Sequence, residues 1–116
     1  APALAAAVRR VGRGEPAEHL HLVERDTVHA VEVYASGRDV VVLHRRVPPP
    51  SGLSVREMQV LAGLAHGLTN PEIGEQYGIG ARTVATHVEH VLAKTGCRNR
   101  VEAACHGARL GIALCR

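Results

Sequence analysis

The feature that most constrains this chain is the segment 70–95, where two stretches with helical spacing are separated by Gly78-Ile79-Gly80. A glycine in the left-handed conformation ends many helices, and a glycine can also cap the start of the next one. Ile79 between them is suited to plugging a core. The segment therefore predicts two short helices joined by a tight turn.

The first of these helices has a start signal at Asn70. We expect Asn70 to be its N-cap, with Pro71 at the first helical position. Ile73 and Tyr77 lie four residues apart on one face, and Gly74 beside them has no side chain. We therefore expect another helix to cross closely at Gly74.

The second helix, at 82–95, separates into two arcs when it is laid out at about 100° per residue. Its apolar arc predicts the core face, which consists of Val84, Val88, Val91 and Leu92. The opposite arc holds Arg82, Thr86, Glu89, His90 and Ala93, with Thr83 and Ala85 at its flanks. In an isolated amphipathic helix such an arc is most simply a solvated surface.

Composition limits the classes of protein but does not select one. The 116 residues include 14 basic and 11 acidic side chains, a net charge of +3 that permits a nucleic-acid partner without requiring one. The three cysteines, Cys97, Cys105 and Cys115, form no CxxC pair and favour a reducing cytoplasm. No apolar run approaches the roughly 20 residues that span a membrane, so no membrane partner is expected.

Residues 1–47 predict a small α+β segment. A short helix is expected at 1–14, followed by β-prone runs at 19–23, 27–35 and 40–47 whose short breaks suit antiparallel hairpins. This order of a helix and a three-stranded antiparallel meander resembles the C-terminal half of a PAS-type sensor domain. Because the other half would supply much of any ligand pocket, we expect no small-molecule site and no cofactor here.

Residues 48–52, with three consecutive prolines, are expected to be an extended polyproline II linker. The chain does not begin with methionine and has only Met58, so we expect a processed chain or a fragment of a longer protein.

Two further helices are expected after this linker. Ser54, with Glu57 three residues later, predicts a capping box at the start of a helix at 55–66. The last helix is expected to begin near Asn99 or Arg100 and to end at Leu110. Its stripe of small apolar residues could finish the core or pack against a second copy in a homodimer: Val101, Ala104, Cys105, Ala108 and Ile112.

Several landmarks keep their mutual spacing in the second half of the chain: Leu53, Arg56-Glu57, Val60-Leu61, Gly67-Leu68-Thr69-Asn70, Glu72-Ile73, Thr83-Val84, His87, Lys94-Thr95-Gly96 and Arg100. With them, Leu53 to Ile112 resembles the LuxR/NarL-type (GerE-like) helix-turn-helix domain. The resemblance implies an all-α four-helix domain at 53–116, preceded by the small α+β segment. It also implies that the third helix of the domain enters the major groove and that the protein forms dimers.

Helix-turn-helix proteins present the N-terminal part of the second motif helix to base edges. We therefore expect Arg82 to contact guanine or a phosphate, Thr86 a base edge or thymine methyl, and Glu89 cytosine N4. Thr83 and Lys94 are expected to contact phosphates. The full expected DNA-binding set is Arg82, Thr83, Ala85, Thr86, Glu89, His90, Lys94, Thr69 and Asn70.

On the outward face of this helix, Ala85 and Glu89 depart from the family pattern, because they stand where relatives often have lysine. One hypothesis is a sequence-specific DNA-binding transcription regulator that acts as a homodimer, with RNA polymerase as a further candidate partner. The alternative is a degenerate helix-turn-helix that serves protein interaction or dimerisation without DNA. Ala85 and Glu89 favour the alternative, whereas Arg82 and Lys94 favour DNA binding.

Catalysis and metal binding are not expected from the sequence. No nucleophile and base occur at a recognisable catalytic spacing, so the chain is not expected to be an enzyme. His87 and His90 lie three apart, but their directions differ and no nearby cysteine or carboxylate is expected to complete a metal site. Glu57 and Arg100 are interpreted as structural partners.

Overall fold

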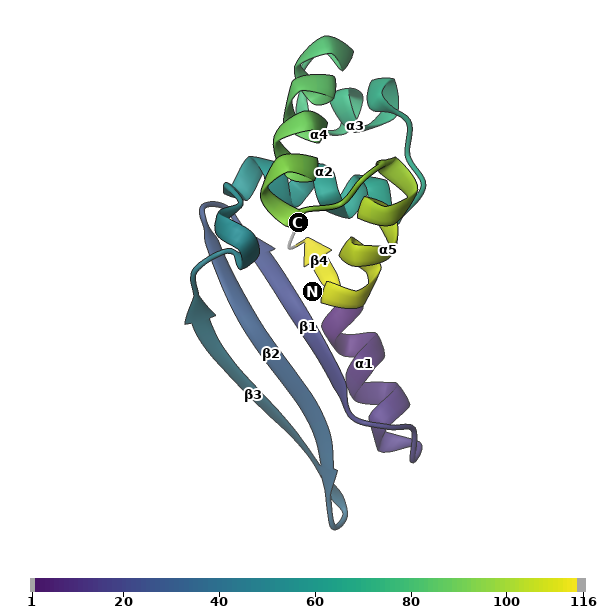
Figure 1. The fold of residues 1–116 in the computed structure, drawn as a ribbon. Coiled ribbons are helices and arrows are strands. Elements are labelled where there is room, and N and C mark those ends of the chain that lie inside the picture. Colours follow the sequence, from purple (N-terminus) through teal and green to yellow (C-terminus); the bar gives the residue numbers. More distant parts are fainter. Residues whose placement is uncertain (1, 115–116) are drawn as a thin grey trace. The chain divides into compact units, whose positions relative to one another are not determined.

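The computed structural model describes residues 2–114, with side chains through residue 112. The chain folds into two units, one formed by residues 2–47 and 110–114 and the other by Pro48–Arg109 (Figure 1). The last described residues therefore belong with the N-terminal unit, although the sequence placed them with the helical domain. None of the helices in residues 2–114 has both the length and the apolar content that crossing a membrane requires.

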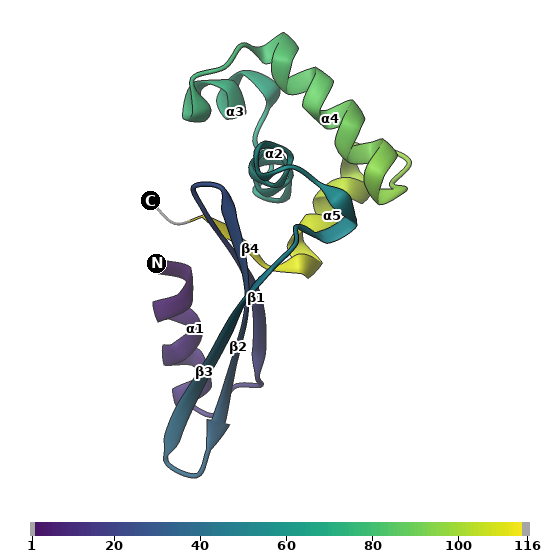
Figure 2. The same ribbon diagram turned by 90° about the vertical axis from the view of Figure 1, so that its left-hand side faces the viewer.

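The N-terminal unit has the expected helix and antiparallel meander. It contains α1 (Pro2–Gly12), β1 (Glu18–Glu24), β2 (Thr27–Ser36) and β3 (Asp39–Val47). In the register of the sheet, Leu20 lies opposite Val31, and Val33 opposite Val42. Helix α1 lies against one face of this sheet (Figure 2), where Ala7 and Val11 bury themselves against Val31 and Val33.

A fourth strand, β4 (Ile112–Leu114), was not expected. It pairs in parallel with β1, which gives the strand order β3-β2-β1-β4. Gly111 makes the turn into β4 with φ +61°, and a Cβ there would lie 2.6 Å from the carbonyl oxygen of His19. The assignment of Ile112 to the apolar stripe of the last helix is therefore wrong, because the helix ends at Leu110.

The expected extended linker is only partly extended. Pro49 has the polyproline II angles φ −56° and ψ 136°. The next residues, Pro50–Gly52, form a 3₁₀ turn (η1), in which the Leu53 N–H donates to the Pro50 carbonyl oxygen at 3.1 Å. Ser51 takes a positive φ of 57°, so the chain bends here instead of continuing straight.

The second unit has the four expected helices. These are α2 (Val55–Ala65), α3 (Asn70–Tyr77), α4 (Ala81–Thr95) and α5 (Arg100–Leu110). Of the predicted core face of α4, Val84 and Val91 are fully buried, and Val88 and Leu92 are half-buried. The largest fully buried side chains contributed by α2 and α3 are Met58, Val60, Leu61 and Ile73.

Both α2 and α3 begin with a capping box. The box predicted at Ser54 and Glu57 is confirmed. The N-cap of α3, however, is Thr69 and not Asn70, because Thr69 and Glu72 form a second capping box. The Thr69 N–H donates to Glu72 Oε1 at 2.9 Å, and the Glu72 N–H donates to Thr69 Oγ1 at 3.3 Å. Asn70 is instead the first residue within the helix.

Two glycines allow close packing around α3. The surface at Gly74 is covered by the backbone of the α3–α4 turn and not by a crossing helix, since a Cβ there would run into the carbonyl oxygen of Ile79. The close helix contact lies at Gly63 of α2, where a Cβ would be 2.7 Å from Ile73 Cγ1. Glycine is therefore required at both positions for the observed packing.

Glu57 joins α2 to α4. It is 4% exposed, and its Oε1 accepts hydrogen bonds from the Ser54 N–H at 2.8 Å and from Lys94 Nζ at 2.7 Å. Burial raises the pKa of Glu57, but the hydrogen bonds from Lys94 and Ser54 and the charge of Lys94 outweigh it, so the pKa lies below its usual value. The carboxylate is therefore held in its charged form.

We expect Gly74→Ala to destabilise the second unit. The added methyl group meets a backbone carbonyl that cannot move without distorting the turn, so the free energy of unfolding should fall by about 1–3 kcal/mol. Urea unfolding monitored by circular dichroism measures the change. Gly80→Ser is the matched control, because no atom lies within 4 Å of a Cβ there and serine is a good N-cap. Equal stability of Gly74→Ala and the wild type would contradict the packing.

We expect Glu57→Ala to lower the free energy of unfolding at pH 7 by about 1–3 kcal/mol. Since the pKa of Glu57 is lowered on folding, its stabilising effect is present above the unfolded pKa of about 4.3 and is lost as the pH falls through the lower folded pKa. The difference between wild type and variant should therefore shrink in acid. Unfolding of both proteins between neutral and acidic pH tests this, with the exposed Glu75→Ala as control.

Candidate nucleic-acid interface

The start of α4 offers open backbone donors and an exposed basic side chain. The N-cap is Gly80, which has no side chain to accept a capping hydrogen bond from the first N–H groups of the helix. The first N–H groups of the helix are therefore available to an anion such as a phosphate. Arg82 and Thr83 are exposed beside them, while Val84 is buried and anchors this turn to the core.

The predicted polar arc of α4 lies on the surface. Arg82, Thr86, Glu89 and His90 are exposed, and Ala85 is half-buried. The Thr86 hydroxyl donates to the carbonyl oxygen of Arg82 at 3.3 Å, which leaves its oxygen free to accept a further hydrogen bond. The arc therefore carries one arginine and one acid of opposite charge.

Thr69 and Asn70 have structural partners at the start of α3. Thr69 caps the helix, as described above, and Asn70 Oδ1 accepts a hydrogen bond from Arg100 Nη1 at 2.7 Å. Arg100 Nη2 also donates to the carbonyl oxygen of Leu68 at 2.6 Å. Arg100 thus fixes the loop before α3 to the start of α5, and its structural role does not involve Glu57.

Lys94 is tied to the core of the unit. Its ammonium group lies 2.7 Å from Glu57 Oε1, and its side chain is 41% exposed. His90, one turn earlier, has Nδ1 at 3.4 Å from Glu57 Oε2. Sequence reasoning missed Glu57 as the partner of both residues, because it precedes Lys94 by 37 positions and no helical or strand period links them.

The sequence predicted no metal site at His87 and His90, partly because no carboxylate was expected near them. This reason is wrong. Glu57, His87 and His90 each place a possible ligand atom within 4.8 Å of the others. The side chain of His87 is half-buried, whereas that of His90 is exposed.

The small-residue stripe of α5 faces outward. Val101 is 72% exposed, Cys105 and Ala108 are also exposed, and Ala104 is half-buried. The core face of this helix is formed instead by Ala103 and Gly107, where a Cβ on the glycine would lie 3.1 Å from Leu61. The alternative in which the stripe finishes the core is therefore wrong, and the stripe remains a candidate dimer surface.

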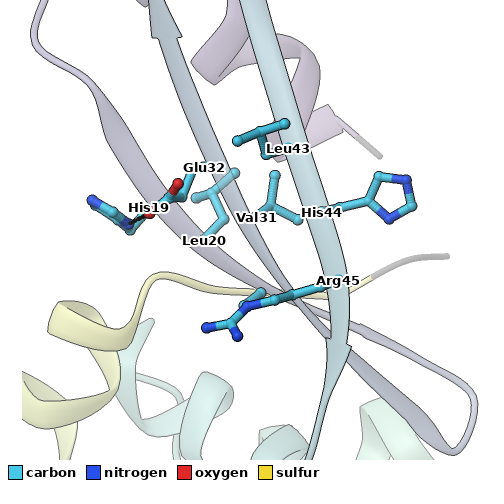
Figure 3. A pocket seen from close by; sticks show the side chains of 8 residues that line it. His19, Leu20, Val31, Glu32, Leu43, His44 and Arg45 are labelled. Carbon is cyan, nitrogen blue, oxygen red and sulfur yellow. Dashed lines mark ion pairs between the residues drawn. The ribbon is translucent and has the colours of Figure 1, made fainter.

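The N-terminal unit has an open hollow on its sheet (Figure 3). It has a volume of about 380 Å³ and is lined by His19, Leu20, Ala30, Val31, Glu32, Leu43, His44 and Arg45. His19 Nδ1 and Glu32 Oε1 lie 3.5 Å apart, with side chains 71% and 54% exposed. The side chains of this pair therefore extend into solvent at the hollow.

Comparison with known proteins places the second unit in a family. Residues 51–107 match the family described as bacterial regulatory proteins, luxR family. The HTH-type transcriptional activator RamA of Corynebacterium glutamicum is 41% identical over 73 residues, which cover 63% of this chain and 26% of RamA. The transcriptional regulatory protein LiaR of Bacillus subtilis is 39% identical over 61 residues, covering 53% of this chain and 29% of LiaR. This chain thus spans less than a third of either relative.

A solved structure has a similar fold. The crystal structure of the phage VqmA–DPO complex has a TM-score of 0.50 and 19% identity, covering 95% of this chain and 62% of that chain. At this identity the likeness concerns the fold alone. The four helices, the capping boxes, the glycine turn and the family match agree, so residues 51–107 of this chain are a luxR-family helix-turn-helix domain.

Proposed function

We propose that this chain is a sequence-specific transcription regulator whose helix α4 enters the major groove of DNA. The observation that carries the proposal is the start of α4, where Arg82 and Thr83 are exposed beside uncapped backbone N–H groups. These groups suit a phosphate, and the exposed Thr86 and Glu89 on the next turn suit base edges. The named regulators among its relatives support the same class of function.

The remaining candidate contacts have secondary roles in this proposal. Thr69 and Asn70 hold the start of α3, so they support the interface by fixing the position of this helix. His90 and Lys94 lie beside Glu57, whose negative charge reduces their attraction for DNA. Ala85 contributes at most an apolar contact.

The proposed active species is a homodimer in a reducing cytoplasm, with RNA polymerase as a candidate partner. The exposed apolar stripe on α5 supports the dimer, because Val101 is a large apolar side chain in open solvent. Two copies would present two α4 helices to successive half-sites. The helix and three-stranded meander of residues 2–47 resemble the C-terminal half of a PAS-type domain, so this unit would be part of a sensor domain.

The second candidate is a protein interaction module that no longer binds DNA. The pairing of Lys94 with Glu57 favours it, because this lysine contributes little net positive charge. Glu89 adds a negative charge to the same helix. Selection of bound sites from random duplex DNA separates the two functions. An enriched motif would support the transcription regulator, whereas the absence of any enriched motif would support the interaction module.

We expect Arg82→Ala to weaken binding to the selected DNA. If Arg82 contacts guanine, the loss should be about 1–3 kcal/mol and specificity should relax at one base position. If it contacts a phosphate, all sequences should weaken alike and the slope of log K against log salt should fall by about 0.9. Titrations at several salt concentrations measure both. Arg109→Ala, exposed in the last turn of α5, is the control, and equal loss in both variants would contradict the interface.

We expect Val101→Glu to weaken the homodimer, because it puts a charge in place of the largest exposed apolar side chain of the α5 stripe. Sedimentation equilibrium should show a shift toward monomer, and selected DNA should lose its paired half-sites. Leu43→Glu is the matched control, since Leu43 is also a large exposed apolar residue, at 51%, but lies in the other unit. A dimer that is unchanged by Val101→Glu would exclude this surface.

A further inference from the structure

Glu57, His87 and His90 form a compact group that the proposed DNA contacts do not explain. The carboxylate comes from the first turn of α2, and the two imidazoles come from neighbouring turns of α4. One possible ligand atom of each residue lies within 4.8 Å of those of the other two. Two helices distant in sequence are thus needed to assemble the group.

The two oxygens of Glu57 differ in their surroundings. Oε1 accepts two hydrogen bonds, from the Ser54 N–H and from Lys94 Nζ. Oε2 faces His90 Nδ1 at 3.4 Å, and no hydrogen bond to Oε2 is made by the residues described. The protein therefore fixes the carboxylate through one oxygen and leaves the other directed at His90.

His87 also has an unused nitrogen. Its Nδ1 is buried, and it has no hydrogen-bond partner among the described residues. A buried polar atom without a partner costs roughly 1–3 kcal/mol, so such an atom is expected to have a purpose or an absent partner. The rings of His87 and His90 are nearly perpendicular at 79°, with centroids 6.4 Å apart, so their nitrogens can approach one point from different directions.

We propose that Glu57, His87 and His90 bind a divalent transition-metal ion, for which zinc is the best match. Two imidazoles and one carboxylate are ligands that zinc accepts, and water would complete a tetrahedral set. Bonds of about 2.0–2.2 Å require ligand atoms roughly 3.3–3.5 Å apart, and the Glu57–His90 pair already has this separation. The three ligand atoms lie within 4.8 Å of one another, so metal binding would require the His87 side chain to rotate to the same separation.

This ion would act as a staple between α2 and α4. It binds the folded arrangement, because the unfolded chain does not bring residue 57 to residues 87 and 90, and it therefore stabilises the unit. The effect does not depend on DNA, so failure of this proposal and failure of the proposed function are distinguishable.

The test is a zinc titration of the full chain. Calorimetry should show one equivalent bound at this site, and the melting temperature should rise by several degrees. His90→Gln should weaken that binding by at least about tenfold and abolish the rise. This variant is preferred to Glu57→Gln because the His90 side chain is 56% exposed and its loss should not unfold the protein. His66→Gln, an exposed histidine at the end of α2, is the matched control and should keep the response.

A second measurement locates the ion, because the N-terminal sheet carries other histidines, among them the paired rings of His29 and His44. Cobalt(II) in place of zinc should shift the imidazole proton resonances of His87 and His90 in NMR spectra. Shifts confined to the sheet histidines would overturn the proposal. It would also be overturned if zinc had no effect on melting, or if His90→Gln retained the full effect.

Discussion

The helical unit depends most on the hydrogen bonds made by the buried carboxylate of Glu57. It accepts the Ser54 N–H that starts α2 and the ammonium group of Lys94 near the end of α4. A buried charge is tolerated only when it is paired and hydrogen-bonded, and both conditions hold here. The same carboxylate therefore sets the start of one helix and attaches it to the helix that is expected to contact DNA.

That attachment affects the proposed interface. Lys94 forms an ion pair with Glu57, so its positive charge is largely neutralised. The positive charge of α4 is therefore concentrated at its N-terminal end, in Arg82 and the backbone N–H groups. Binding would then rely on contacts at this end and on the geometry of two subunits more than on general attraction to phosphates. A metal ion bound to Glu57 would compete with Lys94 for the same carboxylate. The proposed metal site and the proposed DNA interface therefore share this one group.

Much of the fold could be predicted from local patterns. The helices, the meander and the capping box at Ser54 follow from periodicity and from residues within one turn of each other. Predictions failed where two local signals competed or where a segment was short. Thr69 displaced Asn70 as the N-cap because it has Glu72 three residues later, and the three residues of β4 were too few to show a strand period.

The sequence by itself determined the order of elements, the family landmarks and the polar arc of α4, because these depend on residues close together in the chain. Only the tertiary structure decided which partners the charged residues have. It joined Glu57 to Lys94, placed Arg100 on Asn70 and turned the α5 stripe outward. The reason is that such contacts form between residues 30 or more positions apart, whose proximity depends on how the helices pack and not on any local period. Segment 70–95 is thus recognisable from its sequence, but the net charge around His90 and Lys94 depends on Glu57, which lies outside the segment.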